Sequence, residues 1–324
     1  MVAVTGASGH LGANLVRQLL ARGDRVRAVI HGETRAVDGL DVQTLRGDIL
    51  EPESLARAFD GCETVYHLAA LISITGSQYG RVERINIDGA ANAAKAARLA
   101  GVLRYVHVSS VHAYTHAPDQ VVDETSARAQ GAAPAYDRSK AAGEVAVQRE
   151  VERGLHAVIV NPSGVIGPYD FGPSRMGQSV LGLATGKIPA VVEGGFDWVD
   201  VRDVCASIIA ASERGRVGQG YLLGGRWASI AEVGALAAAA ANRAPPRWVT
   251  PRWLASATAP FAQWAQTALG QEPLFTPEGL YCLLHGSRQV DCSKAQRELG
   301  HQSRPLADTI RDTIDWFRTH GRLA

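Results

Sequence analysis

Tyr136 and Lys140 are the residues whose types and spacing are best suited to chemistry. They lie four residues apart in Tyr136-Asp137-Arg138-Ser139-Lys140, so a helix would place the phenol and the ammonium on one face. A tyrosine hydroxyl titrates near pH ~10, and a neighbouring cation lowers that pKa by favouring the phenolate. Such a pair could exchange a proton with a carbonyl or an alcohol. The same spacing also occurs by chance, so the pair needs support from elsewhere in the chain.

A pair of hydroxyls gives part of that support. Ser109-Ser110 follows the apolar segment 105–108, which is typical of a buried strand. In an open parallel sheet, ligands bind beyond the carboxyl ends of the strands. A serine at that edge could hold the substrate oxygen while the tyrosine transfers the proton.

The glycines near the start of the chain indicate what the protein binds. Gly6, Gly9 and Gly12 stand at G-x-x-G-x-x-G spacing between the short apolar segment 2–5 and an amphipathic segment. They suit a tight turn, a close approach of backbone to a pyrophosphate, and packing of helix on strand. The following helix would present its N–H groups to the phosphates. Glycines can simply lead into a helix, but the strand–turn–helix context favours nucleotide binding.

The choice of dinucleotide depends on the end of the second strand. A carboxylate there would bind the adenosine ribose of NAD and repel a 2′-phosphate. This chain has His31 at that point, followed by Glu33 and Arg35. Arg35 could bind a 2′-phosphate, whereas Glu33 could serve NAD, and both could be solvated loop charges. The sequence favours NADP(H) and leaves NAD(H) open.

Short apolar segments alternate with amphipathic ones through the first half of the chain. We expect strands over 2–5, 25–30, 42–45, 64–68, 105–108 and 156–160, and helices over 11–22, 53–59, 82–99 and 136–152. This alternation implies parallel strands joined by right-handed crossovers. The predicted fold is therefore α/β, a Rossmann-type doubly wound parallel sheet.

The pattern changes after Asn161, where proline and glycine interrupt the chain. We expect residues 1–165 to form the NAD(P)-binding domain and 196–225 to rejoin it. Residues 166–195 and 226–324 would mainly form a smaller, interleaved substrate-binding lobe. Trp248, Trp253 and Trp264 are interpreted as the core of that lobe.

Composition excludes several other classes of protein. The chain has 324 residues, 46% of them hydrophobic, and a formal net charge of +1, so its charge indicates neither a nucleic-acid nor a membrane partner. Its four cysteines form no CxxC pair, and no histidine motif or carboxylate cluster suggests a metal. Because Met1 leads directly into the first expected strand, no signal peptide is expected. A cytoplasmic enzyme is the expectation.

Taken in order, these motifs resemble the extended short-chain dehydrogenase/reductase superfamily, which includes the NAD-dependent epimerase/dehydratase family. The most similar branch contains dihydroflavonol-reductase-like and hopanoid-associated sugar-epimerase-like proteins. The resemblance covers nearly the whole chain. It rests on 5–12, 47–49, 67–70, 86–89, 108–110, 136–140, 161–163, 167–168 and 198–204.

The resemblance implies a role for each matching residue. The catalytic set would be Ser110, Tyr136 and Lys140, with Ser110 preferred over Ser109 because it precedes Tyr114 by four residues. Asp48 and Ile49 would contact the adenine, and Asn86 would be structural or relay water. The expected cofactor-binding residues are Gly6, Ser8, Gly9, His10, Leu11, Gly12, His31, Arg35, Asp48, Ile49, Leu68, Ala69, Ala70, Asn86, Val108, Ser109, Lys140, Pro162, Ser163 and Val165.

Substrate contacts are expected from Ser110, His112, Tyr169 and Met176. His112 could instead be an ordinary loop residue, and His67 is interpreted as a packing residue. Trp198 and Asp200 match a structural motif of the superfamily and are interpreted as scaffold.

The predicted function is NAD(P)H-dependent reduction of a ketone or aldehyde to an alcohol. Tyr136 would act as acid–base, and the aromatic lobe favours a hydrophobic carbonyl. Two alternatives stay open: a nucleotide-sugar epimerase or dehydratase, whose diphosphate Arg175, Arg202, Arg226 and Arg288 could bind, and a non-catalytic NAD(P)-sensing regulator. A homodimer could form through the helices 82–99 and 136–152.

Overall fold

The centre of the molecule is a sheet of seven parallel strands, seen in a computed structural model that describes residues 1–270 and 273–323. Its order is β11-β7-β5-β4-β1-β2-β3, and every neighbouring pair is parallel. The strands are β1 (Val2–Thr5), β2 (Val26–Ile30), β3 (Val42–Arg46), β4 (Thr64–His67), β5 (Arg104–Val108), β7 (Ala157–Pro162) and β11 (Gly220–Leu223). The strand order reverses between β1 and β4, so a ligand crevice is expected beyond their carboxyl ends.

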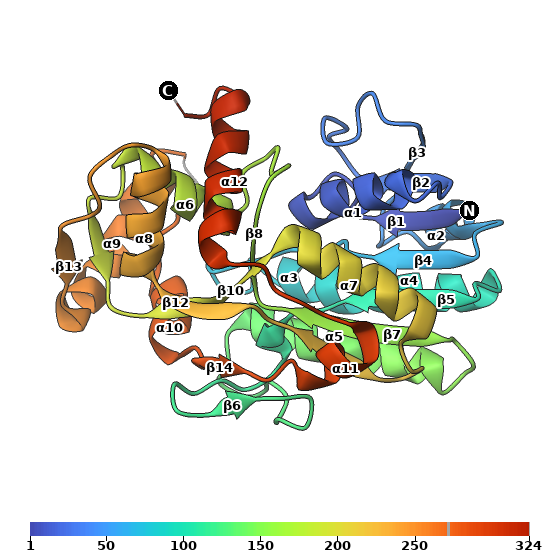
Figure 1. Ribbon diagram of the computed structural model, residues 1–324. Helices are drawn as coiled ribbons and strands as arrows, with labels where there is room; N and C mark the ends of the chain where they lie inside the picture. Colours follow the sequence, from blue (N-terminus) through green and yellow to red (C-terminus); the bar gives the residue numbers. More distant parts are fainter. Residues whose placement is uncertain (271–272, 324) are drawn as a thin grey trace.

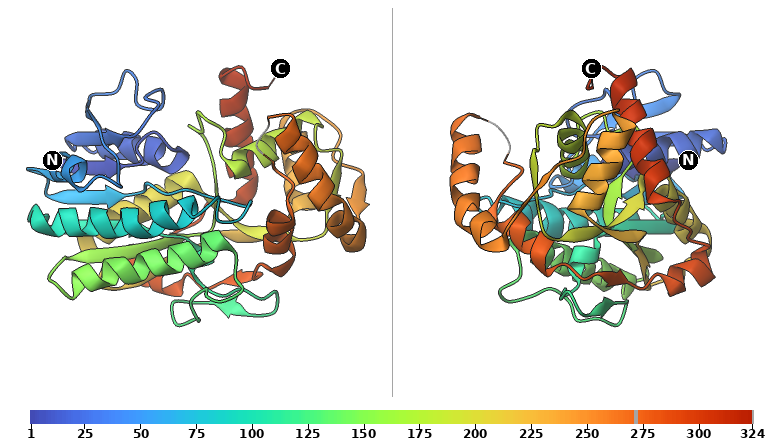
Figure 2. Two further views of the ribbon diagram at one scale, coloured as in Figure 1. Left: turned by 180° about the vertical axis from the view of Figure 1, so that it is seen from behind. Right: turned by 60° about the vertical axis from the view of Figure 1, so that its left-hand side comes forward.

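Helices cover both faces of this sheet (Figures 1 and 2). On one face lie α1 (His10–Ala21), α7 (Val201–Arg214) and α11 (Ser293–Leu299), and on the other α2 (Pro52–Phe59), α4 (Gly89–Leu99) and α5 (Ala135–Val151). Leu15, Val16 and Leu19 of α1 are buried at helical spacing, which is the reason this segment packs on the sheet. The predicted doubly wound α/β fold is confirmed.

A smaller layer of helices and short strands completes the molecule. It contains α6 (Arg175–Thr185), α8 (Ile230–Ala240), α9 (Arg252–Ala268), α10 (Pro277–His285) and α12 (Leu306–Thr319), which we call the second lobe. One three-stranded sheet has the order β12-β10-β8, formed by Arg226–Ser229, Gly195–Asp200 and Gly164–Ile166. Two strand pairs join β9 (Ala190–Val192) to β13 (Trp248–Thr250) and β6 (Val121–Val122) to β14 (Gln289–Val290).

The expected continuous helix over 82–99 is interrupted. The structure has the short α3 (Arg81–Glu83), a π-helical turn (Arg84–Asp88) and then α4. Asn86 lies in the π turn and is hydrogen-bonded outside the helix. Single π turns of this kind are common at functional sites.

The tryptophans of the second lobe are not its core. Trp248 is 74% exposed, and Trp253 and Trp264 are each 72% exposed. The lobe core is instead aliphatic, with Val180, Leu183, Ile310 and Ile314 buried around Trp198. The interpretation of the three tryptophans as core residues was therefore wrong.

Candidate active site

The glycine turn leaves room for a phosphate group at the start of α1. A Cβ on Gly6, whose φ is +68°, would lie 2.8 Å from the backbone N of Ala69, and one on Gly12 would lie 2.2 Å from the Gly6 carbonyl oxygen. A Cβ on Gly9 would meet only the Gly6 oxygen, at 3.4 Å. Gly6 and Gly12 therefore serve the turn and the packing, whereas Gly9 leaves one side of the turn open.

The helix end itself fits an anion. Gly9 is the N-cap of α1, no side chain caps that end, and the first turn has no acidic residue. Uncapped first-turn N–H groups and the helix dipole favour a phosphate. The backbone from Gly9 to Gly12 would thus hold the pyrophosphate of a dinucleotide.

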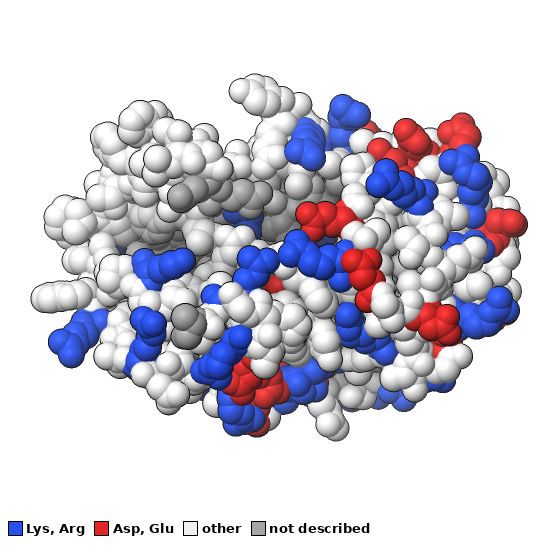
Figure 3. Space-filling view, turned by 90° about the horizontal axis from the view of Figure 1, so that it is seen from above, with Lys and Arg blue, Asp and Glu red and all other residues white. Residues whose placement is uncertain are grey.

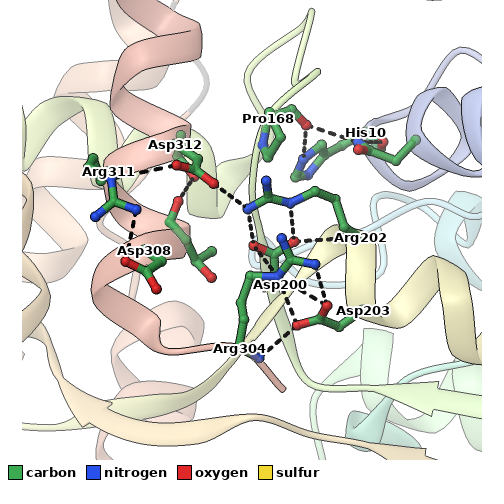
Figure 4. Close-up of polar contacts among 12 residues, drawn as sticks. His10, Pro168, Asp200, Arg202, Asp203, Arg304, Asp308, Arg311 and Asp312 are labelled. Atoms are coloured by element: carbon green, nitrogen blue, oxygen red, sulfur yellow. Dashed lines mark hydrogen bonds and ion pairs between the residues drawn. The ribbon is translucent and has the colours of Figure 1, made fainter. Parts of the chain in front are cut away.

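The side chain of His10 is directed away from that role. Its Nε2 lies 3.1 Å from the Pro168 carbonyl oxygen, which also accepts a hydrogen bond of 2.9 Å from Asn14 (Figure 4). The next residue, Tyr169, has a φ of +61°. The Arg17 guanidinium carbon lies 4.6 Å from the centre of the Tyr169 ring. The loop predicted to meet substrate is therefore fixed to α1. The substrate role of Tyr169 stays a prediction.

At the adenosine end, His31 and Asp48 lie close together at the ends of β2 and β3. The His31 Nε2 is 3.6 Å from an Asp48 carboxylate oxygen. Arg35 pairs with Glu33 at 2.9 Å, and both side chains are more than half exposed. Ile49 packs over Gly89, where a Cβ would lie 2.5 Å from the Ile49 Cδ1. The structure thus brings two carboxylates, an imidazole and a guanidinium to this end.

The end of β4 is fixed by the Thr5 hydroxyl. It lies 2.8 Å from the His67 Nδ1 and accepts longer hydrogen bonds from the backbone N–H groups of Leu68 and Ala69. His67 is buried and stacks on His107 at 5.5 Å. Burial lowers the pKa of His67 to about 3, so its ring is neutral. His67 packs in the interior and, through the Thr5 hydroxyl, orders the segment 68–70 that is expected to line the cofactor cleft. This agrees with the interpretation of His67 as a packing residue.

Lys140 extends from α5 to the end of β5. Its Nζ donates to the Val108 carbonyl oxygen at 3.0 Å, and the side chain is buried. Burial lowers the pKa of Lys140 to about 8, against the opposing charge of Glu144. Val108, Ser109 and Lys140 therefore meet where the cofactor was expected.

Tyr136 is half-buried on the same helix face as Lys140 and lies beside the Ser110 side chain. Burial raises the pKa of Tyr136, the Ser110 contact opposes that rise, and the charge of Asp137 adds to it. The expected lowering of this pKa by Lys140 is thus wrong for the structure as it stands, because burial dominates and the ammonium is directed to Val108. Ser110 also accepts a 3.2 Å hydrogen bond from the His112 N–H.

His112 has a charged partner that the sequence did not reveal. Its Nδ1 lies 3.3 Å from the Asp137 carboxylate, and its ring meets the Tyr136 ring edge-on at 6.0 Å. Burial lowers the pKa of His112, but the hydrogen bond and charge of Asp137 outweigh it and raise the pKa overall. The structure therefore sets an imidazole–carboxylate pair beside Tyr136.

Glu144 is a second residue that sequence reasoning missed. It is buried one turn after Lys140, pairs with Arg128 at 2.7 Å and accepts a 2.5 Å hydrogen bond from Asn161. Asn161 also donates to the Ser110 carbonyl oxygen at 3.0 Å. This chain of contacts fixes the backbone of Ser110 against α5. Its only signal in the sequence was the spacing of four residues between Lys140 and Glu144.

Asn86 has a structural role. Its side chain bonds both backbone polar groups of Leu71, at 2.8 and 2.9 Å, and donates to Ser139 at 2.9 Å. A Cβ on Gly143 would lie 2.6 Å from the Asn86 carbonyl oxygen. Asn86 thus connects the loop after β4 to α5. These contacts show the structural role, which was one of the two roles expected for Asn86.

Three expected residues lie where β7 leads into β8. Pro162 ends β7, and the Ser163 hydroxyl donates to Asp197 at 2.5 Å. Val165 is half-buried in β8, and Met176 lies near this strand, 3.6 Å from a Cβ on Gly164. The backbone at Pro162 can flank a cofactor, while the Ser163 hydroxyl already has a partner.

Trp198 and Asp200 are scaffold, as expected. The Trp198 Nε1 donates to the Ala228 carbonyl oxygen at 3.0 Å. Asp200 caps α7, accepts from Arg202 and lies 3.4 Å from Arg304 (Figure 4). Arg202 in turn reaches Asp312 of α12 at 2.8 Å, so this network connects the second lobe to the main sheet.

Two absences hold for the described residues. Within 1–270 and 273–323 no group of three or more His, Cys, Asp or Glu side chains could hold a metal ion. In the same part of the chain, no helix has the length and apolar content needed to cross a bilayer.

The fold and site define a dinucleotide-binding enzyme with a Ser–Tyr–Lys set. The model of the NAD dependent epimerase/dehydratase family matches residues 2–224. The chain belongs to this family, within the extended short-chain dehydrogenases/reductases, and is an NAD(P)-dependent enzyme of oxidoreductase or dehydratase type.

Named relatives agree with this assignment. The chain is 36% identical to sterol demethylase protein B of Methylococcus capsulatus over 99% of both chains. It is 32% identical to a putative dihydroflavonol 4-reductase of Synechocystis, over 98% of this chain and 94% of the relative. Among solved structures, gox2253 superposes with a TM-score of 0.86 at 32% identity, covering 100% of this chain and 99% of the other.

Proposed function

We propose that this protein is an NAD(P)H-dependent reductase that converts a ketone or aldehyde to an alcohol. The observation that carries the proposal is that Tyr136 and Ser110 both contact His112, close to buried Lys140 at the end of β5. The backbone of 9–12, the segment 68–70 and Lys140 would hold the dinucleotide, which supplies a hydride when bound. Asp48 and His31 would flank its adenosine end.

Each catalytic group has a distinct task. Tyr136 protonates the substrate oxygen, and Ser110 donates a hydrogen bond to the same oxygen as negative charge develops. Lys140, held at the end of β5 by the Val108 carbonyl oxygen, positions the dinucleotide beside Tyr136. His112, held by Asp137, is suited to restoring the proton to the site, because its protonated form is favoured.

NADP(H) is the proposed co-substrate. The Arg35–Glu33 pair is exposed, and exposed ion pairs contribute little, so Arg35 can exchange Glu33 for a 2′-phosphate. His31 would add a second donor. This preference predicts a higher kcat/KM with NADPH than with NADH, and Arg35→Ala should reduce that ratio while Lys187→Ala, an exposed cation of the second lobe, should not.

The second lobe would bind a hydrophobic carbonyl compound. The names of two relatives refer to a sterol and to a dihydroflavonol, both largely apolar ring systems. The arginines that a nucleotide sugar would need have other partners. Arg202 is held by Asp200 and Asp312, Arg226 pairs with Glu232, and Arg288 lies over Trp227. The contact of Arg202 with buried Asp200 favours reduction over epimerisation, whereas the exposed Arg226–Glu232 pair is as exchangeable as Arg35–Glu33.

A homodimer is also proposed, through α4 and α5 as in the sequence-based expectation. Leu99 is 67% exposed and Val145 of α5 is 50% exposed. Sedimentation velocity of the purified protein checks this: a single species at the monomer mass contradicts it.

The direct test of function begins with the purified protein. Denaturation followed by mass spectrometry identifies any nucleotide it retains, and apolar ketones and aldehydes are then screened with NADPH. Turnover with NADPH and an exchangeable nucleotide support the proposal. Near-stoichiometric retained NAD without net reduction of any carbonyl would instead indicate an epimerase.

A further inference from the structure

Helix α9 has its large aromatic residues on the outside. Trp253, Phe261 and Trp264 are 72%, 75% and 72% exposed. Ala257 lies between Trp253 and Phe261, and Ala268 lies one turn after Trp264, so the five residues follow one another at helical spacing. They therefore form a single apolar stripe along the helix. We call these five residues the α9 stripe.

The opposite face of α9 is the one that packs. Ala255 and Ala259 are buried there against Leu280 of α10. An amphipathic helix normally buries its large apolar residues and exposes its polar ones. In α9 the small alanines are inside and the tryptophans outside, so the stripe is not explained by the fold of the lobe.

The apolar surface continues beyond the helix. Trp248 and Val249 of β13, which leads into α9, are 74% and 54% exposed, and Leu269 just after α9 is 74% exposed. Monomeric soluble proteins seldom expose large contiguous apolar patches, and those that exist mark interaction sites.

Within the segment that carries the stripe, every charged residue is an arginine. Residues 243–270 contain Arg243, Arg247 and Arg252 and no aspartate or glutamate. Arg252 pairs with Glu193 at 3.0 Å, but both side chains are 57% exposed. In Figure 3 the upper left of the molecule, toward the second lobe, carries almost no coloured side chains, whereas the Rossmann end carries many of both signs. Cations beside an apolar surface complement anionic lipid headgroups.

The shape of the second lobe favours a bilayer over a second copy of the chain as the partner of the α9 stripe. Figure 2 shows α9 as the outermost helix of the lobe, standing away from the main body. A protein partner would need a complementary face of about 800 Å² on each side, whereas a projecting, tryptophan-rich helix can enter the headgroup region without one. Tryptophan is enriched at membrane–water interfaces because its ring is apolar and its N–H is polar.

The stripe is also connected to the active site. Helix α10 packs on α9, and its N-cap Thr276 donates to the Ile74 carbonyl oxygen at 2.7 Å, in the loop after β4. Helix α10 therefore connects the stripe to the loop that follows β4.

We infer that the α9 stripe, with Trp248 and the flanking arginines, docks this protein on the surface of an anionic lipid bilayer. The expectation of no membrane partner rested on the overall charge of the chain and on tryptophans thought to lie in a core. This docking does not depend on which reaction the site performs, and binding is measured without turnover.

Co-sedimentation with vesicles of phosphatidylcholine and phosphatidylglycerol tests the inference. We expect the protein to sediment with these vesicles, and Trp253→Ser/Phe261→Ser/Trp264→Ser to lower its partition coefficient by at least roughly tenfold. The matched control is Tyr79→Ser/Leu103→Ser/Val217→Ser, which removes three other exposed apolar side chains and should bind like the wild type. Circular dichroism and thermal melting verify that each variant folds.

A second readout uses the unaltered protein. Brominated lipid in the same vesicles should quench tryptophan fluorescence, and high salt should weaken binding because the arginines contribute. The inference is overturned if the wild type stays in the supernatant, or if the stripe variant binds as well as the control. It is equally overturned if the wild type forms a dimer that the stripe variant cannot form and neither binds vesicles, because a second copy is then the occupant.

Discussion

At the residue scale, the surroundings of His112 decide how the site handles protons. Asp137 faces it from α5, Tyr136 meets its ring edge, and His116 lies 5.4 Å away. Burial and the charge of His112 lower the pKa of His116 to about 4, so His116 is neutral near pH 7. The charged neighbour of His112 is therefore Asp137.

This arrangement predicts a pH profile. Because the folded-state pKa of His112 lies above its ordinary value, its proton is present at low pH and is lost as pH rises through the raised pKa. We expect kcat/KM for reduction to fall across that range. Asp137→Asn removes the charge that raises the pKa, so the fall should begin at lower pH.

His116→Gln is the matched control for this prediction. It changes the neighbouring ring but no charge near pH 7, so the descending limb should stay in place. A limb that Asp137→Asn fails to move would contradict the role given to the pair.

At the scale of elements, the glycines of the turn before α1 differ in role, because Gly12 is needed for folding and Gly9 is proposed to serve nucleotide binding. Gly9→Ala meets only one atom at 3.4 Å, whereas Gly12→Ala places a Cβ 2.2 Å from a backbone oxygen. We expect Gly12→Ala to lower stability by about 1–3 kcal/mol. Gly9→Ala should melt close to the wild type and yet bind NADPH more weakly, since its methyl group occupies the open side of the turn.

Thermal melting without nucleotide and titration with NADPH check the two variants together. If Gly9→Ala binds NADPH as tightly as the wild type, the phosphate is not held where the turn predicts.

Elements of the first half could be predicted because strand and helix periodicity is strong there. The strand expected over 42–45, for example, is β3, and the helix expected over 11–22 is α1. The π turn at Asn86 was missed because it depends on bonds to Leu71 and Ser139, distant in sequence. The second lobe was harder still, since its tryptophans look like core residues in composition and lie outside in space.

Some residues of the candidate site could likewise be predicted from the sequence, and others could not. The glycines, Ser110, Tyr136 and Lys140 form local motifs and could be named from the sequence, although their catalytic roles stay predictions. Asp137, Glu144 and Asn161 act through contacts between β7, α5 and the loop after β5, which no local pattern encodes. The prediction of a lowered pKa for Tyr136 was wrong for a related reason, because the burial of a side chain depends on the whole fold.

At the scale of the whole molecule, the lobe and the sheet meet through Asp200, Arg202 and Asp312. The Asp200 side chain is 1% exposed and that of Asp312 is 33% exposed. Burial raises the pKa of Asp200, but the hydrogen bonds and charge of Arg202 outweigh it and lower the pKa overall. Asp200 thus contributes stability above its ordinary pKa, and the contribution is lost as pH falls through the lower folded value.

Two substitutions compare these carboxylates. Asp200→Asn leaves Arg202 without its buried partner and should cost about 3–5 kcal/mol, whereas Asp312→Asn should cost about 1 kcal/mol or less. Urea unfolding near pH 7 measures both. Equal costs would mean that the two carboxylates hold the lobe to the same extent.

The measurement that tests the central claim most directly is single-turnover reduction by Tyr136→Phe. With a carbonyl compound from the screen and NADPH, we expect the rate to fall at least about 100-fold while NADPH binding is retained. Tyr79→Phe, an exposed tyrosine, should keep the wild-type rate. If Tyr136→Phe also keeps most of that rate, Tyr136 is not the proton donor and the proposed mechanism is wrong.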